Sequence, residues 1–270
     1  MEEEEEAKII AALSTLTSSK LSDLTHSILS LTHRHHRRLA ALLSSPPIFF
    51  LTLHHLHSLS LPNKTLLIAR HLLSSLQPLT SHFQHTPPHA FNSTIRQRES
   101  DTVMLLLLLC EVQQQNPEAL QTPLAKWHGV LTKHFRGTLL TLSGIGTYKG
   151  AILMPYIEMV TRCRRFLSVM GGGGKAGREV AAASATVVAL PSVQVSGGGG
   201  LECVICKEEI NEGRDVCKLP CEHLFHWMCI LPWLRKRNTC PCCRYRLPTD
   251  DVFGEIQRLW EVLVEVSRRS

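Results

Sequence analysis

The sequence lacks the features that carry a protein across a membrane or into a secretory pathway. Its most apolar run, residues 103–110, is far shorter than the roughly 20 apolar residues that a bilayer-spanning helix needs. The N-terminus, MEEEEEAK, is acidic where a signal peptide is basic and where a classical transit peptide is poor in acidic residues. We therefore expect no transmembrane helix, and we interpret residues 103–110 as a buried core helix.

The sequence also has few strand-like patterns and only a small net charge. Almost no segment alternates apolar and polar residues with a period of two, and no internal repeat is visible. The 29 Lys and Arg against 23 Asp and Glu give a net charge of +6, which permits an anionic partner but does not require one. Because 44% of the 270 residues are hydrophobic, the chain can form one sizeable apolar core and a small module.

Residues 1–170, rich in Leu, Ser and His, are predicted to form a mainly α N-terminal region. Apolar residues recur at helical spacing from Ile9 and again from Leu21. Residues 80–101 are polar and are predicted to form a long loop, and residues 151–169 a further helix. Pro46–Pro47 is predicted to break the chain of helices and Pro78 to close a helix, while Asn116 and Pro117 are predicted to begin one as N-cap and first residue. Pro155 is predicted to mark either the true start of the last helix or a kink within it.

Two tetraglycine tracts divide the rest of the chain, and glycine loses more conformational entropy on ordering than any other residue. A terminal helix is predicted after an N-cap at Thr249 or Asp250, with packing on the preceding module as the default and dimerisation or partner binding as alternatives. The predicted organisation is a helical region for substrate or localisation (1–170), a Gly-rich flexible linker (171–200), a Cys/His module (201–248) and a C-terminal helix (249–270).

Eight of the ten cysteines lie between residues 203 and 243, together with the last two of the fifteen histidines. Zinc takes four such ligands tetrahedrally, and a C-x2-C turn delivers two thiolates to one ion. Eight ligands therefore predict two structural Zn²⁺ ions in closed sites, with Cys217 and Cys242 as bystanders. The predicted ligands are, in order, Cys203, Cys206, Cys221, His223, His226, Cys229, Cys240 and Cys243.

This order of ligands resembles the RING-H2 fingers of E3 ubiquitin ligases. The resemblance implies a cross-brace, in which metal binding folds a module too small to fold alone. The first ion then takes Cys203, Cys206, His226 and Cys229, and the second takes Cys221, His223, Cys240 and Cys243.

The same resemblance implies a surface for an E2 ubiquitin-conjugating enzyme, made of Ile205, Trp233 and Pro241. It also implies that Arg244 is a linchpin that hydrogen-bonds E2 and ubiquitin together, which suits the several donors of a guanidinium. Ordinary packing of a small domain and a solvated arginine are the alternatives, although Trp is a typical interface anchor. The implied mechanism orients an E2–ubiquitin thioester toward a lysine of an unknown protein substrate, with no catalytic residue and no covalent intermediate on this chain.

The whole chain also resembles the plant amyloplast-associated RING ligases of the shoot-gravitropism class. The acidic start, the segments LTHSILSLTHRH, SLSLPNKT and AILMPYIEMVTRCRRF, and the RING-H2 pattern carry this resemblance. It implies a plastid (amyloplast) location and a role in shoot gravitropism. The acidic N-terminus favours the cytosolic face of the organelle, with a cytoplasmic location as the alternative.

Two other classes of function compete with a ligase. A non-catalytic adaptor or scaffold would use the RING only for binding. A nucleic-acid partner is not expected, because the charge excess is mild and no recognition motif is present. Histidine clusters at residues 33–36 and 54–57 lack cysteine or carboxylate companions at ligand spacing. With Arg34, Arg37 and Arg38, the first predicts a basic solvated helix face that permits peripheral contact with an organelle membrane.

Overall fold

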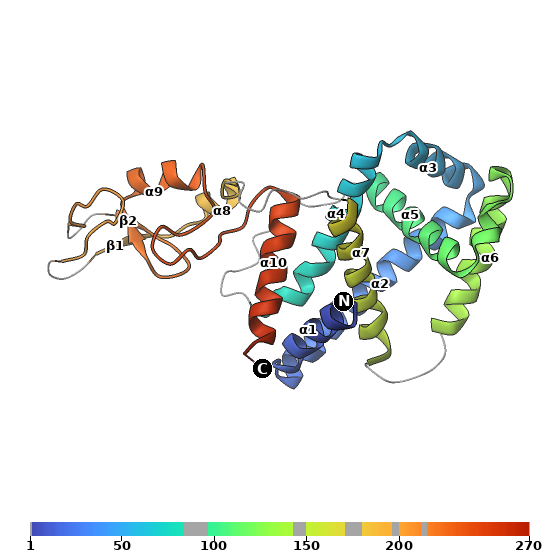
Figure 1. Cartoon of the computed structure of the whole chain (residues 1–270), viewed down its shortest axis with the longest axis horizontal. Coiled ribbons are helices and arrows are strands. Elements are labelled where there is room, and N and C mark those ends of the chain that lie inside the picture. The colour runs from blue at the N-terminus through green and yellow to red at the C-terminus, as the bar shows by residue number, and fades with distance from the viewer. Residues whose placement is uncertain are drawn as a thin grey trace.

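The structure is a computed structural model that describes residues 2–83, 97–142, 150–170, 180–195, 200–211 and 215–269. Figure 1 shows a bundle of helices at one end and a small module containing a sheet at the other. The mainly α N-terminal region predicted from the sequence is confirmed. Its elements are α1 (Glu2–Ser14), α2 (Ser18–Ser44), α3 (Pro46–Ser58), α4 (Leu61–Thr80), α5 (Gln97–Gln115), the 3₁₀ turn η1 (Pro117–Leu120), α6 (Leu124–Leu142) and α7 (Gly150–Met170).

Two apolar cores hold the bundle together. The first combines buried side chains of α1, α2, α4 and α7, and the second combines those of α2, α3, α5 and α6. Helix α2 is long enough to contribute to both cores, with Ile28 in the first and Leu42 in the second. Residues 103–110 lie within α5 as predicted, and its Val103 and Leu105 are almost fully buried. The bundle is therefore one continuous body built around two clusters.

The prolines follow the predicted pattern only in part. Pro46 begins α3 directly after α2 ends, and Pro117 begins η1, although the Asn116 side chain makes no capping hydrogen bond. Pro78 was predicted to close a helix, but it lies within the last turn of α4. A proline there removes one hydrogen bond, while the burial of the adjacent Leu79 favours continuing the helix. Pro155 lies inside α7 in the same way.

The predicted loop over residues 80–101 is shorter at both ends. Helix α4 continues to Thr80, and α5 begins at Gln97. Residues 84–96 lie outside the described part of the chain. Within the described residues no single helix is long and apolar enough to span a membrane. Only α2 and α3 pass such a test as a pair, and they are bent by 106° relative to each other.

The His- and Arg-rich segment of α2 is solvated on one side only. His33, Arg34 and Arg37 are exposed, as the predicted basic face requires. His35, by contrast, faces the buried His71 of α4, with ring centroids 5.4 Å apart. Half of this segment therefore helps to hold α2 against its neighbours.

Acid is expected to destabilise the bundle through this histidine pair. Burial lowers the pKa of His71 to about 3, and burial followed by the charges of Arg34 and Arg38 lowers the pKa of His35 to about 4. An unfolded imidazole has a pKa of about 6.5. The unfolded state therefore binds protons first, and stability falls as the pH drops from about 6.5 toward 4. In urea unfolding across this range, His71→Phe should flatten the dependence on pH, whereas the exposed control His54→Gln should not.

The default prediction, that the C-terminal helix packs on the module, is wrong for its apolar face. Helix α10 (Val252–Ser267) packs that face on α1 and α4 of the bundle, and it contacts the module through the ion pair of Arg246 with Glu261. Trp260 and Leu263 are buried in the first core, and the guanidinium of Arg164 from α7 lies 3.8 Å from the centre of the Trp260 ring. Arg164 Nε also donates to Glu5 Oε1 of α1 at 3.1 Å. The strongly amphipathic α10 needs a large apolar partner, which the open side of the bundle provides.

The module contains a three-stranded antiparallel sheet in the order β1 (Ser192–Gln194), β2 (Asp215–Lys218) and β3 (Leu224–Phe225), followed by α9 (Trp227–Leu234). Part of the predicted linker, residues 180–195, folds onto it. This part contains α8 (Ser184–Val188) and β1, and β1 pairs with β2 in the register Val193↔Val216. Residues 171–179 and 196–199 lie outside the described part of the chain.

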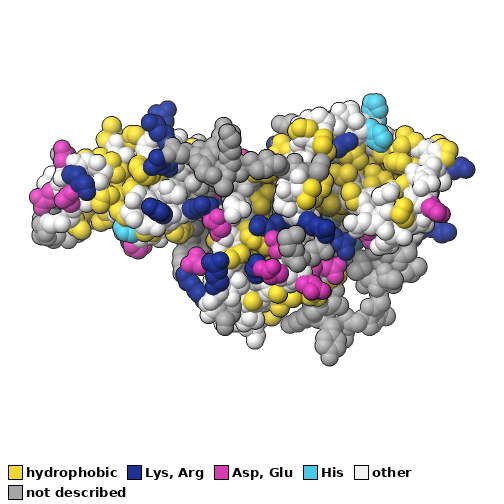
Figure 2. Space-filling model, in the orientation of Figure 1, with side chains coloured by type: hydrophobic (Ala, Val, Ile, Leu, Met, Phe, Trp, Pro, Cys, Tyr) yellow, Lys and Arg dark blue, Asp and Glu magenta, His cyan; other side chains and the backbone are white. Residues whose placement is uncertain are grey.

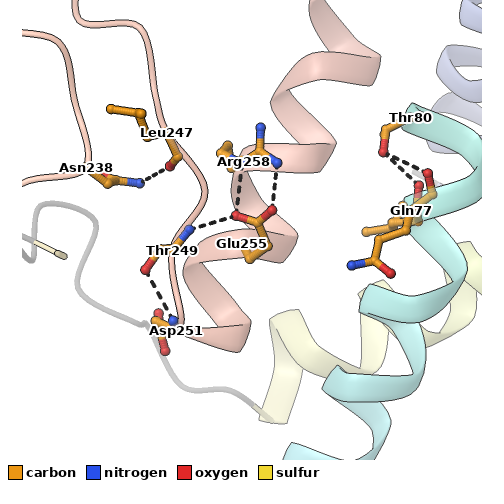
Figure 3. Close-up of polar contacts among 9 residues, drawn as sticks. Gln77, Thr80, Asn238, Leu247, Thr249, Asp251, Glu255 and Arg258 are labelled. Atoms are coloured by element: carbon orange, nitrogen blue, oxygen red, sulfur yellow. Dashed lines mark hydrogen bonds and ion pairs between the residues drawn. The ribbon is translucent and has the colours of Figure 1, made fainter. Parts of the chain in front are cut away.

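Module and bundle are joined by a hydrogen-bonded junction, residues 247–251 (Figure 3). The N–H of Thr249 donates to Glu255 Oε2 at 3.2 Å, and Thr249 is only 1% exposed. Glu255 in turn accepts two hydrogen bonds from the buried Arg258, at 2.6 and 2.9 Å. Asp251 caps α10 by accepting from the N–H of Gly254 at 2.8 Å, so the cap lies one or two residues later than predicted.

Candidate functional site

The first C-x2-C turn of the module closes through two backbone hydrogen bonds. The N–H of Cys203 donates to the carbonyl of Glu208 at 2.9 Å, and the N–H of Lys207 donates to the carbonyl of Cys203 at 2.8 Å. Lys207 follows the second cysteine, Cys206, and has a φ of 64°. This left-handed residue reverses the chain tightly, so that both cysteines remain on one turn.

The second C-x2-C turn repeats this construction. Cys240 donates to the carbonyl of Tyr245 at 2.8 Å, and Arg244 donates to the carbonyl of Cys240 at 3.0 Å. Arg244 follows Cys243 and has a φ of 61°. The third described non-glycine residue with positive φ, Glu222 at 69°, also directly follows a predicted ligand. Three of the predicted metal ligands are thus each followed by the same local reversal of the chain.

These turns bring the eight predicted ligands into two clusters. Within each cluster, the ligand atoms lie within 4.8 Å of one another. In the first, Cys206 Sγ is 3.4 Å from His226 Nδ1, and in the second, Cys221 Sγ is 3.4 Å from His223 Nδ1. The clusters are Cys203, Cys206, His226 and Cys229, and Cys221, His223, Cys240 and Cys243.

Both clusters fit zinc. Each has three thiol sulfurs and one imidazole nitrogen, the ligand types that structural Zn²⁺ prefers, and four ligands complete a tetrahedral site. The clusters interleave along the chain, because Cys221 and His223 of the second lie between the two ligand pairs of the first. Among the described residues, no other His, Cys, Asp or Glu group lies at such spacing, so the histidines of α2 and α3 form no such cluster there.

The two extra cysteines of the module lie outside both clusters. Cys217 on β2 is fully buried, and burial raises the pKa of its thiol to about 12, so it is a neutral apolar side chain at physiological pH. Cys242 is exposed, and its backbone N–H donates to the Sγ of Cys240 at 3.4 Å. The geometry therefore agrees with their predicted role as bystanders.

The predicted E2 contacts come from three segments of the module. Ile205 lies in the first C-x2-C turn, Trp233 near the end of α9, and Pro241 in the second turn. All three are half-buried. The indole Nε1 of Trp233 donates to the carbonyl of Thr239 at 2.7 Å, and the guanidinium of Arg237 lies 4.9 Å from the Trp233 ring centre. The orientation of the Trp233 ring is therefore fixed before any partner binds.

Arg244 is exposed, and its backbone belongs to the second C-x2-C turn. The hydrogen bond to Cys240 and the left-handed φ hold its Cα next to the second cluster. Its long side chain thus starts from a fixed point beside the predicted E2 contacts.

The prediction missed the contribution of residues 180–195 to this module. The N–H of Ala182 donates to the carbonyl of Leu234 at the end of α9, at 2.9 Å, and both Ala182 and Leu190 are buried in the module core. A short signal was present, because Val193 and Val195 alternate with polar residues. The adjacent glycines concealed it.

Comparison with known proteins agrees with this geometry. The Ring finger domain family matches residues 201–244. Together with the two interleaved clusters, this match defines the module as a RING finger, and its two sites as the structural zinc sites of the RING-H2 type. No solved structure matches the chain.

The rest of the chain is also matched. The whole chain is 54% identical over 280 residues to the E3 ubiquitin-protein ligase SGR9, amyloplastic, of Arabidopsis thaliana. This match covers 99% of this chain and 98% of that protein. The E3 ubiquitin-protein ligase RNF181 of Xenopus tropicalis is 53% identical over 72 residues, 26% of this chain and 46% of that protein. The RNF181 homolog of Drosophila melanogaster is 56% identical over 62 residues, 23% of this chain and 42% of that protein.

The chain belongs to the family of the SGR9 protein, and it is a RING-type E3 ubiquitin-protein ligase. The predicted fold class, the predicted ligase function and the two predicted zinc ions are thereby confirmed. As a RING-type ligase it acts together with an E2 enzyme and ubiquitin.

Proposed function

We propose that the module binds an E2 enzyme through Ile205, Trp233 and Pro241, and that it promotes direct ubiquitin transfer from the E2 thioester to a substrate lysine. The observation that carries the proposal is the cross-braced pair of ligand clusters, which ties the segments bearing these three side chains to one small core. Bound zinc supplies the folding energy of the module and leaves no coordination position open. A half-buried tryptophan held by a hydrogen bond is a suitable interface anchor.

Arg244 acts as the linchpin in this proposal. Its guanidinium donates to the E2 and to ubiquitin at once, which restricts the flexibly linked ubiquitin to one orientation. Orientation of the thioester lowers the entropic cost of attack by the lysine, and it requires no nucleophile on this chain. The fixed backbone at Arg244 limits the conformational entropy that this contact costs.

The protein acts at the amyloplast in this proposal, on the side of the organelle that faces the cytosol. The SGR9 protein of Arabidopsis thaliana is named as amyloplastic, and the match to it extends over nearly the whole of both chains. We also propose a role in shoot gravitropism and a bundle that selects the protein substrate. The proposal includes no nucleic-acid partner.

Replacing Trp233 with alanine is expected to weaken E2 binding by about 30-fold, because truncating a central interface tryptophan costs about 2 kcal/mol or more. Autoubiquitination with a panel of E2 enzymes should fall accordingly, with zinc content unchanged. Met228→Ala on the same helix is the matched control. Its side chain is 83% exposed and belongs neither to a ligand cluster nor to the proposed E2 surface. In the same assay Arg244→Ala should retain E2 binding but slow the transfer.

A non-catalytic adaptor is the competing function. Wild-type protein that holds two zinc ions and is inactive with every E2 of the panel would favour the adaptor. If Trp233→Ala were as active as Met228→Ala, the assignment of the E2 surface would be wrong.

A further inference from the structure

Helix α3 is apolar on two opposite faces. Its inner face, with Phe49, Leu53 and Leu56, is at most 3% exposed and packs against α2 and α5. On its outer face, Ile48 is 51% exposed and Leu51 is 62% exposed. A helix that is apolar all round is normally covered on every side, by protein or by lipid. The part of the chain that the structure describes covers the inner side of α3 and leaves Ile48 and Leu51 more than half exposed.

The exposed apolar surface continues beyond α3. Phe50 is 38% exposed, Leu61 at the start of α4 is 54% exposed, and Leu124 at the start of α6 is 45% exposed. The start of α6 lies beside α3, since the rings of Trp127 and His57 are 6.3 Å apart. Figure 2 shows hydrophobic side chains next to histidines over this end of the bundle. We call this surface the outer α3 face, made of Ile48, Phe50, Leu51, Leu61 and Leu124.

The two helices that carry most of the outer α3 face, α3 and α4, have no carboxylate. Residues 24–98 contain no Asp or Glu, although they include all of α3 and α4. Glu118 in η1 is an exposed carboxylate that precedes α6 in the sequence. The titratable side chains on the same elements include His54, His55 and His57 on α3, Lys64 in the first turn of α4 and Lys126 in the first turn of α6. The surroundings therefore complement an anionic surface.

We propose that the outer α3 face docks on the surface of a bilayer that contains anionic phospholipid. With 13 residues, α3 is about 20 Å long, too short to span a bilayer, so it lies in the plane of the interface. A lipid surface fits better than a protein partner, because α3 and α4 offer no carboxylate to pair with a partner's cations. The inference deepens the proposed location at an organelle surface, and it rests on that location.

The position of α3 gives this docking a functional consequence. Figure 1 places α3 and the RING module at opposite ends of the molecule. The lipid contact therefore involves the bundle alone, and none of the E2 contacts on the RING belongs to the outer α3 face.

Binding to vesicles tests the proposal with the purified, zinc-loaded full chain. We expect it to sediment with vesicles made of equal parts phosphatidylcholine and phosphatidylglycerol, and much less with phosphatidylcholine alone or at high salt. Ile48→Glu/Leu51→Glu should reduce the partition coefficient at least about tenfold, because it places two charges in the apolar contact. The matched control Val188→Glu/Met228→Glu changes side chains that are 87% and 83% exposed on the RING side, and it should bind as wild type does.

Two results would overturn the proposal. One is wild-type protein that does not bind the anionic vesicles. If Ile48→Glu/Leu51→Glu then still releases the protein from organelles, the outer α3 face docks on a protein and not on lipid. The other is a double variant with unchanged helix content that binds the vesicles as wild type does. Autoubiquitination in solution should be the same for wild type and the double variant. Failure of the ligase assay would refute the proposed function and leave the vesicle result to be judged separately.

Discussion

Cys221→Ser is expected to abolish ligase activity and to reduce the zinc content of the protein. Cys221 is one of four ligands in the second cluster, and a serine hydroxyl does not replace a thiolate on zinc. A RING module is too small to fold on its apolar core alone, and a structural zinc ion typically contributes about 10–16 kcal/mol of binding free energy. Loss of one ion should therefore unfold the segments that carry Trp233 and Pro241.

The matched control is Cys242→Ser, two residues from one ligand and one from another. Cys242 is exposed and belongs to neither cluster, so two zinc ions and full autoubiquitination are expected. Metal analysis of both variants, together with circular dichroism, separates the module from the bundle. The helix signal should persist in Cys221→Ser, because the bundle has its own cores. Two zinc ions and wild-type activity in Cys221→Ser would refute the assignment of the second site.

Trp260→Ala is expected to lower the free energy of unfolding of the bundle by about 3–5 kcal/mol. Trp260 is 4% exposed at the contact of α10 with the first core. Its truncation opens a cavity there and removes the aromatic partner of the Arg164 guanidinium. The lost cation–π contact with the partly buried Arg164 accounts for about 1 kcal/mol of that range. Urea unfolding followed by circular dichroism measures the change.

Phe253→Ala on the same helix provides the comparison. Phe253 is 40% exposed, so its truncation should cost much less than that of Trp260. The folded RING of Trp260→Ala should still release ubiquitin from an E2 thioester to free lysine, because its zinc clusters do not involve α10. Equal stability losses in the two variants would show that α10 does not dock through Trp260.

The metal centre could be predicted from the sequence because its information is local. One tight turn joins Cys203 to Cys206 and another joins Cys240 to Cys243, and the C-x2-C spacing alone predicts both turns. Interleaving of the two clusters followed from the resemblance to RING-H2 fingers, and the structure brings together the same two sets. The E2 contacts stay a prediction, because their role depends on a partner.

The long-range packing could not be predicted in the same way. The apolar face around Trp260 and Leu263 shows that α10 needs a partner, but helical periodicity does not identify which surface provides it. Similarly, β1 has three residues, and its stability comes from pairing with β2 over a gap of some 20 residues in sequence. Adjacent glycines made the segment resemble a linker, although residues 180–195 belong to the module core.

The docking of α10 limits how far the RING, and with it the ubiquitin on an E2 bound there, can move relative to the bundle. A module at the end of a free tether samples a volume that grows with tether length, so lysines over a wide surface compete for transfer. Here the chain enters the RING after α7 and returns to the same bundle through α10, with Thr249, Glu255 and Arg258 bonded at the return. The distance between the bundle and the RING then sets the distance at which a lysine can meet the E2 thioester. If the bundle selects the substrate as proposed above, the position of a lysine in space, more than its local sequence, determines whether it is modified.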